Sequence, residues 1–262
     1  MAKPIRLDRD ARGVATLRLT RADRHNALDA AMIAELAAAC AALATDPAVR
    51  VVVLAAAGKS FCAGGDLGWM RDQMVATAQE RAAGARRIAT TLGALDRLPK
   101  PLIGRIQGPA FGGGIGLMSV CDAAVGAVGA TFALTEVRLG LIPAVISPYV
   151  IRRIGEPNAR RMMLSARIFD SHEAVRLGLL SRVVKPDALD NAVEEELAPF
   201  LQVAPGAVEK TKRLIRGQAG VIDPARVEAS IAALVEAWQD AEADAGIRAF
   251  FAREKPPWAQ AD

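Results

Sequence analysis

SFCAGGDL at residues 60–67 and QGPAFGGGIG at residues 107–116 are two glycine-rich stretches that together indicate the fold class. Each follows a short, mostly apolar run, at residues 49–54 and 102–106, of the kind found in strands buried on both faces of a parallel sheet. Ligands of such sheets bind where the strands end. We therefore expect both stretches at one edge of a sheet, where they form a binding site.

The segments on either side of these stretches predict an α/β fold that ends in helices. Residues 4–8 and 12–19 flank a turn, and the alternation of side chains in the second segment predicts a β-hairpin. Asp29 is a suitable N-cap for a helix over about 30–44. Further elements are predicted as helices over about 72–95, 113–121, 186–201, 204–216 and 223–245, and as strands over 123–128, 131–134 and 181–184. Strands that alternate with helices indicate α/β rather than α+β packing.

The composition excludes several classes of protein. The 262 residues, 52% of them hydrophobic, suffice for one large core. The net charge of +4 comes from Lys and Arg spread along the chain without a basic run, so we expect no nucleic-acid partner. No apolar run approaches the roughly 20 residues of a membrane span, and we expect neither a membrane partner nor a signal peptide. Cys40, Cys62 and Cys121 lack metal-ligand spacing and leave one cysteine unpaired, which favours a cytoplasmic location.

The glycines of the two stretches are suited to holding an oxygen atom. Consecutive glycines let the backbone approach a ligand closely, and the start of a helix presents free N–H groups. One N–H group from each stretch, meeting at the same oxygen, would make an oxyanion hole. The alternative is that these glycines only form tight turns. Dinucleotide binding and a Walker A loop both fit poorly, because neither stretch has the required spacing.

Six motifs in the order of the chain resemble the crotonase (enoyl-CoA hydratase/isomerase) superfamily. The paired glycine-rich stretches match its central signature. The other five motifs are RHNAL at 24–28, KP at 100–101, FALTEVRLGLIP at 132–143, AVRLGLL at 174–180 and GIRAFF at 246–251. Each motif is weak alone, but their common order over nearly the whole chain makes an accidental match improbable.

This resemblance implies a fold, a substrate and an assembly. The fold would be a crotonase-like ββα spiral core over residues 1–200. A C-terminal helical region over residues 201–262 would trimerise and close the coenzyme A site. The substrate would be an acyl-CoA thioester, and the assembly a homotrimer or a dimer of trimers. The family needs no cofactor and no metal, since coenzyme A belongs to the substrate.

The resemblance also implies the residues of the site. The backbone N–H groups of Gly65 and Gly113 correspond to the oxyanion-hole donors, and Glu136 corresponds to the catalytic acid/base. A carboxylate in a mostly apolar pocket has a raised pKa, which suits proton transfer near neutral pH. The expected contacts to coenzyme A and the substrate are Ala63, Asp66, Leu67, Gly68, Trp69, Gly116 and Ala144. For Asp66, a role as a helix cap is an equal alternative.

Gly116 departs from the pattern of many hydratases in this family. Those enzymes carry a second glutamate two residues after the glycine triplet, whereas this chain has a glycine there. Glu136 alone would then both deprotonate water and return the proton to Cα. The same single carboxylate also suits an isomerase that moves a proton between Cα and Cγ. A non-catalytic acyl-CoA-binding relative and a protein with an RNA-binding side activity remain further alternatives.

Two stretches favour hydration and suggest a substrate. GDLGWM at 65–70 and LIPAVISPYV at 141–150 resemble the branch that contains methylglutaconyl-CoA hydratases of leucine degradation, which is similar in having Gly in place of the second glutamate. The missing side chain at Gly116 is expected to leave room for a branched acyl group. Trp69, Met70 and Ile146 are expected to line the acyl pocket or, alternatively, to pack in the core.

Overall fold

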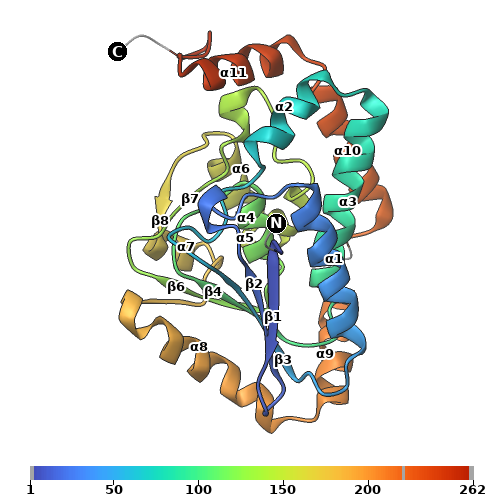
Figure 1. The fold of residues 1–262 in the computed structure, drawn as a ribbon, viewed down its shortest axis with the longest axis vertical. Helices are drawn as coiled ribbons and strands as arrows, with labels where there is room; N and C mark the ends of the chain where they lie inside the picture. Colours follow the sequence, from blue (N-terminus) through green and yellow to red (C-terminus); the bar gives the residue numbers. More distant parts are fainter. Residues whose placement is uncertain (1–2, 220–221, 260–262) are drawn as a thin grey trace.

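The structure is a computed structural model that describes residues 3–219 and 222–259, and its largest feature is a six-stranded sheet (Figure 1). The strands lie in the order β1-β2-β3-β4-β6-β9. Their bounds are β1 (Ile5–Arg9), β2 (Val14–Leu19), β3 (Val51–Ala56), β4 (Leu102–Ile106), β6 (Ala123–Ala127) and β9 (Arg182–Val184). The predicted hairpin is confirmed as the antiparallel pair β1–β2, and every other pair in this sheet is parallel.

Strand β3 is buried on both faces, as its composition predicted. Val52 and Leu54 face the main core, where α1 (Ala30–Thr45) and α3 (Ala78–Asp96) pack together over the sheet. Val51 and Val53 face the opposite core, which α8 (Leu189–Leu197) covers. Figure 1 shows α1 and α3 on one side of the sheet and α8 on the other. Because alternate residues of one strand point to opposite faces, a run of Val and Leu serves both cores.

A smaller sheet places the second glycine-rich stretch beside the segment that leads to Glu136. It contains β5 (Ala110–Phe111), β7 (Thr131–Ala133) and β8 (Phe169–Asp170) in the order β5-β7-β8. Strands β5 and β7 are parallel, and Phe111 lies opposite Ala133. Residues that follow the two strands therefore emerge at the same end of this sheet.

The helix predicted over 72–95 is wrong, because the structure divides this region into two helices. Helix α2 (Leu67–Val75) ends before Thr77, and α3 begins at Ala78. The Thr77 Oγ1 atom accepts the Glu80 N–H at 3.2 Å, and the Glu80 carboxylate accepts the Thr77 N–H at 2.8 Å. This reciprocal capping box starts a new helix at a fixed place, and the sequence TAQE at 77–80 carries its signature.

The C-terminal region is helical, as predicted, but it contains one more break. The helix predicted over 223–245 is two helices, α10 (Pro224–Ala237) and α11 (Ala241–Ala252). Helix α10 packs against α3, and α11 packs against the short helix η2 (Glu136–Leu139). The other helices are η1 (Ala22–Arg24), α4 (Gly113–Ser119), α5 (Ser147–Ile154), α6 (Glu156–Met163), α7 (Ser171–Arg176), η3 (Pro186–Ala188), η4 (Ala198–Gln202) and α9 (Pro205–Gln218). None of the helices in the described residues is long and apolar enough to cross a membrane.

Candidate active site

The first glycine-rich stretch is held by a backbone bridge between Gly65 and Leu28. The Leu28 N–H donates to the Gly64 carbonyl at 2.7 Å, and the Asp66 N–H donates to the Leu28 carbonyl at 3.0 Å. In a planar trans peptide, the carbonyl and the next N–H point in opposite directions. The Gly64 carbonyl points toward Leu28, so the Gly65 N–H points away from it.

The second glycine-rich stretch lies against the first. Helix α4 begins at Gly113, so the Gly113 N–H belongs to the first turn, which has no intrahelical acceptors. A Cβ atom built on Gly64 would lie 3.6 Å from the Gly113 nitrogen, and one built on Gly113 would lie 3.8 Å from the Gly64 Cα. The two stretches therefore adjoin each other at Gly64 and Gly113, as predicted.

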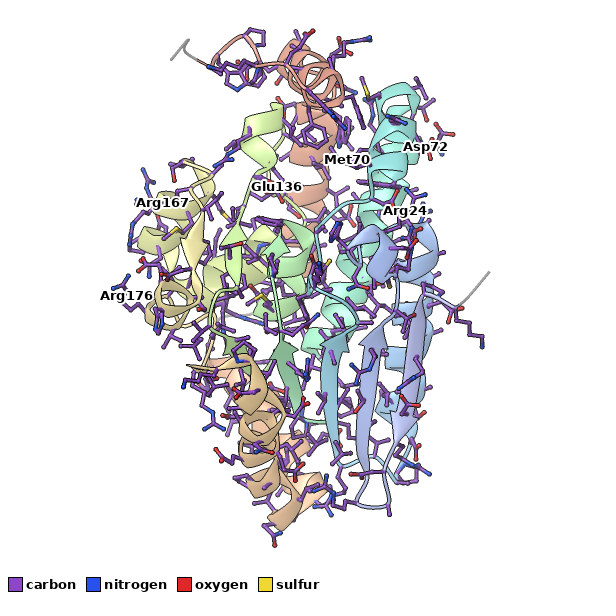
Figure 2. The ribbon with its side chains drawn as sticks, turned by 60° about the vertical axis from the view of Figure 1, so that its left-hand side comes forward. Arg24, Met70, Asp72, Glu136, Arg167 and Arg176 are labelled. Atoms are coloured by element: carbon purple, nitrogen blue, oxygen red, sulfur yellow. The ribbon has the colours of Figure 1, made fainter. Side chains whose placement is uncertain are left out.

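Glu136 lies beside the second stretch. The Glu136 Oε1 atom is 2.7 Å from the position that a Cβ atom on Gly112 would take. Gly112 also has a φ of 46°, a left-handed conformation that other residues rarely adopt. The positive φ favours glycine at this position, and a Cβ atom there would also displace the end of the Glu136 side chain. Figure 2 shows Glu136 in the interior of the molecule, whereas Arg167 and Arg176 lie at its edge.

One oxygen of the Glu136 carboxylate is buried without a partner. Its Oε2 atom is inaccessible to solvent and has no hydrogen-bond partner in the described part of the chain. Burial raises the pKa of Glu136 to about 7, and a hydrogen bond with its own backbone only partly opposes this shift. An apolar cluster that includes Met70, Leu141 and Trp238 lies between the neighbouring helices α2, α10 and α11. The carboxyl group can therefore take up and release a proton near neutral pH.

Most of the expected coenzyme A contacts lie along the first stretch and the start of α2, while Gly116 lies in α4 and Ala144 precedes α5. The Ala63 N–H donates to the His25 carbonyl at 3.0 Å, and the Leu67 side chain is half exposed. The Trp69 ring lies 3.6 Å from where a Cβ atom on Gly65 would be, so the indole packs against Gly65. Ala144 is buried.

Asp66 has a structural role that the sequence offered as an alternative. Its Oδ1 atom caps α2 by accepting the N–H groups of Gly68 at 2.8 Å and Trp69 at 3.4 Å. Its Oδ2 atom lies 3.0 Å from Arg21 Nη2. Both carboxylate oxygens therefore have partners within the protein, and the prediction of a helix cap is confirmed.

The expectation that Gly116 leaves room for a branched acyl group is wrong. A Cβ atom at this position would lie 2.5 Å from the Ile146 Cγ2 atom. Ile146 belongs to the main core and is only 5% exposed. Helices α4 and α5 approach each other so closely that Ile146 occupies the space that a side chain at Gly116 would need. Gly116 is therefore a packing position between two helices.

Two polar side chains that the sequence analysis did not single out support the first stretch. Asn26 is fully buried and donates to the Ala57 and Ser60 carbonyls at 2.8 and 2.9 Å. Gln107 donates to the Gly58 and Ser60 carbonyls at 3.2 and 3.0 Å. Both amides thus fix the backbone that leads into the first stretch. The position of Asn26 in the early Asn-Ala-Leu motif was the available signal.

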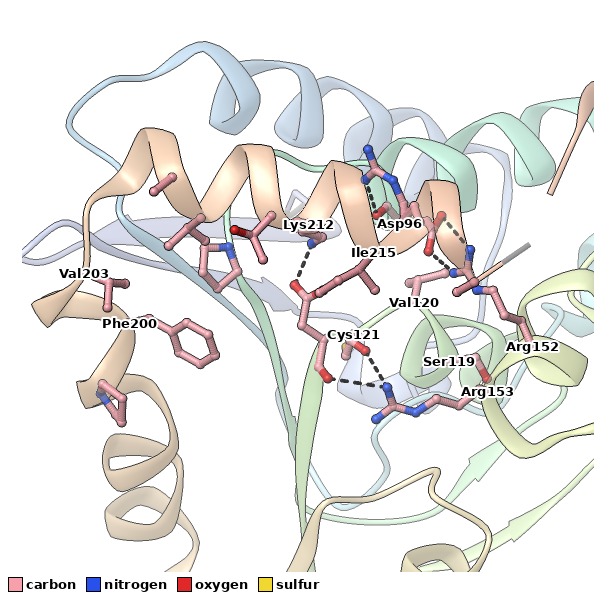
Figure 3. A pocket seen from close by; sticks show the side chains of 18 residues that line it. Asp96, Ser119, Val120, Cys121, Arg152, Arg153, Phe200, Val203, Lys212 and Ile215 are labelled. Atoms are coloured by element: carbon pink, nitrogen blue, oxygen red, sulfur yellow. Dashed lines mark hydrogen bonds and ion pairs between the residues drawn. The ribbon is translucent and has the colours of Figure 1, made fainter. Parts of the chain in front are cut away.

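A large cavity of about 850 Å³ lies elsewhere, beneath α9 (Figure 3). Apolar side chains such as Phe200, Val203 and Ile215 line part of it. Two of its cations are paired with carboxylates, Lys212 with Asp122 at 2.5 Å and Arg152 with Asp96, while Arg153 and Arg216 donate to backbone carbonyls. The lining contains neither of the glycine-rich stretches nor Glu136, so this cavity is separate from the candidate active site. Among the described residues, no group of His, Cys, Asp or Glu side chains is arranged to hold a metal ion.

Fold and site together define a two-sheet α/β protein in which two glycine-rich turns adjoin and a glutamate carboxylate lies beside the second of them. The profile of the enoyl-CoA hydratase/isomerase family matches residues 9–261. A Thermus thermophilus protein provisionally named an enoyl-CoA hydratase is 34% identical over 250 residues, which cover 93% of this chain and 96% of the relative. The crotonyl-CoA hydratase of Syntrophomonas wolfei is 31% identical, with 92% and 93% of the two chains covered.

The solved structures agree with these relatives. An enoyl-CoA hydratase from Shewanella pealeana superposes with a TM-score of 0.80 at 36% identity, covering 97% of this chain and 96% of the other. An enoyl-CoA hydratase from Mycobacterium avium gives a TM-score of 0.87 at 29% identity, covering 99% and 100%. The chain therefore belongs to the enoyl-CoA hydratase/isomerase family, and the expected crotonase fold is confirmed.

Proposed function

We propose that the chain is an enoyl-CoA hydratase that adds water across the α,β double bond of an acyl-CoA thioester. The Glu136 carboxylate removes a proton from water, and the water oxygen bonds to Cβ. The electrons of the double bond move to the thioester oxygen and form an enolate. Glu136 then returns the proton to Cα, which restores the thioester and the ionised carboxylate.

The adjoining turns support an oxyanion hole made by the N–H groups of Gly65 and Gly113. The enolate carries more negative charge on oxygen than the thioester carbonyl does, so two fixed donors stabilise the transition state more than the bound substrate. The backbone bridge with Leu28 directs the Gly65 N–H away from Leu28. No backbone acceptor for this N–H group is found among the described residues. The start of α4 supplies the second donor.

The observation that carries this proposal is the buried, unpartnered Oε2 atom of Glu136 beside Gly112. A carboxylate with a pKa of about 7 is half ionised at neutral pH, so it can act first as a base and then as an acid. The isomerase alternative is not favoured, because the relatives that match most of this chain are named hydratases.

For the acyl group, we propose a branched substrate such as 3-methylglutaconyl-CoA. Relatives at 30% and 33% identity are named mevalonyl-CoA hydratase and (E)-benzylidenesuccinyl-CoA hydratase. The acyl groups in these two names differ, so the hydratases that resemble this chain are not all named for one substrate. The distal carboxylate of a methylglutaconyl group needs a cation. Arg87 is suitably placed, because its Nη2 atom and the Trp69 ring lie 3.9 and 4.0 Å from the same point, the Cβ position of Gly84.

We further propose that the protein is a homotrimer or a dimer of trimers in which the C-terminal helices contact a second copy. Helix α9 supports this assembly, because Leu214 and Ile215 are 61% and 59% exposed and a cavity remains beneath the helix (Figure 3). Sedimentation equilibrium tests it, and a monomer at micromolar concentration would contradict it.

Hydration is tested by incubating the protein with crotonyl-CoA, 3-methylglutaconyl-CoA and a 3-enoyl-CoA. Loss of the absorbance of the conjugated thioester shows hydration, whereas its appearance from the 3-enoyl substrate would show isomerisation instead. Glu136→Gln should lower kcat by about 100- to 10,000-fold but retain binding, and unchanged turnover would remove Glu136 from the mechanism. Arg87→Gln should raise the KM for 3-methylglutaconyl-CoA and leave that for crotonyl-CoA unchanged. Equal effects on both substrates would reject Arg87 as the carboxylate partner.

A further inference from the structure

A single arginine side chain joins the two segments whose bridge directs the Gly65 N–H. Arg21 follows β2, and its side chain is only 21% exposed. Its Nη1 atom donates to the Ala27 carbonyl at 3.0 Å and lies 2.6 Å from the Asp29 carboxylate. Its Nη2 atom lies 3.0 Å from the Asp66 carboxylate. One guanidinium group therefore contacts both the segment 27–29 and the first glycine-rich stretch.

The carboxylates of Asp29 and Asp66 each bind Arg21 with one oxygen and cap a helix with the other. Asp29 Oδ1 accepts the Met32 N–H at 2.8 Å at the start of α1, while Asp66 Oδ1 caps α2. Their Oδ2 atoms face Arg21. A guanidinium group is planar and presents its donors at fixed angles. Arg21 consequently fixes the starts of α1 and α2 relative to each other.

The peptide that carries the Gly65 N–H lies inside this arrangement. Leu28 sits between the two residues that Arg21 contacts on one side, and Gly65 directly precedes Asp66 on the other. The bond from Leu28 N–H to the Gly64 carbonyl sets the plane of the peptide between Gly64 and Gly65. A shift of either segment would rotate this plane and redirect the N–H group.

We propose that Arg21 is a positioning residue for the oxyanion hole, because it holds the Leu28–Gly65 bridge in the register that directs the Gly65 N–H at the substrate oxygen. This role rests on the proposed hydratase function. It does not require Arg21 to contact the substrate, since both terminal nitrogens of Arg21 already bond to groups of the protein.

A second arginine offers a matched control. Arg12 also contacts two carboxylates, those of Asp10 and Glu194, and it joins the β1–β2 turn to α8. Its side chain is half exposed, and neither of these partners belongs to a glycine-rich stretch. Replacing Arg12 therefore removes a similar pair of ionic contacts without affecting the Gly65 bridge.

The test compares Arg21→Gln, Arg21→Lys and Arg12→Gln with the wild type in crotonyl-CoA hydration and in the absorbance of a bound 2,4-dienoyl-CoA. An oxyanion hole polarises the conjugated thioester and shifts its absorbance to longer wavelength. Loss of one donor lowers kcat by about 100- to 1000-fold, so a misdirected donor in Arg21→Gln should lower kcat by about 10- to 100-fold. The absorbance shift should shrink, and KM should stay within about threefold, since donors of this kind act mainly on the transition state. Arg21→Lys should be intermediate because it keeps the charge but not the planar fork, and Arg12→Gln should match the wild type.

Two results would overturn the positioning role. One is a folded Arg21→Gln protein, judged by circular dichroism, with wild-type kcat and an unchanged absorbance shift. The other is a raised KM at unchanged kcat, which would show a loss of binding only. If Arg21→Gln does not fold, Arg21→Lys decides by the same two readouts. If the wild-type protein hydrates crotonyl-CoA but causes no absorbance shift of the bound 2,4-dienoyl-CoA, the positioning role alone is rejected. If the wild-type protein shows neither hydration nor an absorbance shift, the hydratase proposal is rejected as well.

Discussion

Replacing Glu136 with glutamine should make the protein more stable and less active, and the gain in stability should depend on pH. The carboxyl group is buried, its Oε2 atom lacks a partner in the described part of the chain, and its pKa is raised from 4.5 to about 7. The folded protein therefore binds more protons than the unfolded chain between these two values. The stability that the protonated carboxyl group contributes is fully present below pH 4.5 and is lost as the pH rises through about 7.

The size of the effect follows from the difference between the two pKa values. Each pKa unit corresponds to about 1.4 kcal/mol, so the raised pKa of Glu136 implies a loss of about 3 kcal/mol of unfolding free energy between pH 4.5 and pH 8. Glutamine has a similar shape and no charge to bury. The stability difference between Glu136→Gln and the wild type should therefore grow by about 3 kcal/mol over this range, while kcat should fall by about 100- to 10,000-fold because the acid/base is gone.

Guanidinium unfolding of both proteins at pH 4.5, 6 and 8, at one protein concentration, measures this difference. Glu228→Gln is a control with the opposite sign. Its carboxylate lies at the surface, and its pKa is lowered by the hydrogen bond with Arg86. Relative to the wild type, that variant should lose the contribution of this ion pair as the pH rises toward the ordinary pKa of glutamate, and the difference should stay constant at higher pH. A stability difference for Glu136→Gln that stays constant with pH would refute the buried, unpaired carboxylate on which the mechanism depends.

Three further predictions concern catalysis, packing and capping. Because Glu136 must be ionised to accept a proton from water, kcat/KM for hydration should fall below an apparent pKa of about 7; a pH–rate profile that is flat from pH 5 to 8 would contradict this. Gly116→Ala should destabilise the protein by about 1–3 kcal/mol, since the new Cβ meets Ile146 at 2.5 Å, and an unchanged Tm would show that the space is open after all. Thr77→Ala should cost about 1 kcal/mol by removing the α3 cap and leave kcat unchanged, which unfolding and steady-state assays of the same sample can check.

Local patterns in the sequence were sufficient for the parts of the protein that depend on neighbouring residues. The Asp29 cap, the buried strand β3 and the short helix α4 all follow from side chains within a few residues of one another, and all are confirmed. The break between α2 and α3 was predictable in the same way, because the capping box at Thr77 is a local motif. Motif order also identified Glu136 as the candidate acid/base among the 29 acidic residues.

Contacts between distant segments were decided only by the tertiary structure. Gly116 and Ile146 are 30 positions apart, and the sequence does not show that the isoleucine fills the space left by the glycine. The same holds for Arg21, whose carboxylate partner Asp66 lies 45 positions away. The raised pKa of Glu136 likewise results from the surroundings that burial creates, not from its neighbours in the chain. Sequence determines which groups are available, whereas the packing of sheets and helices determines their distances and their exposure to water, and these set both the direction of an N–H group and the pKa of a carboxylate.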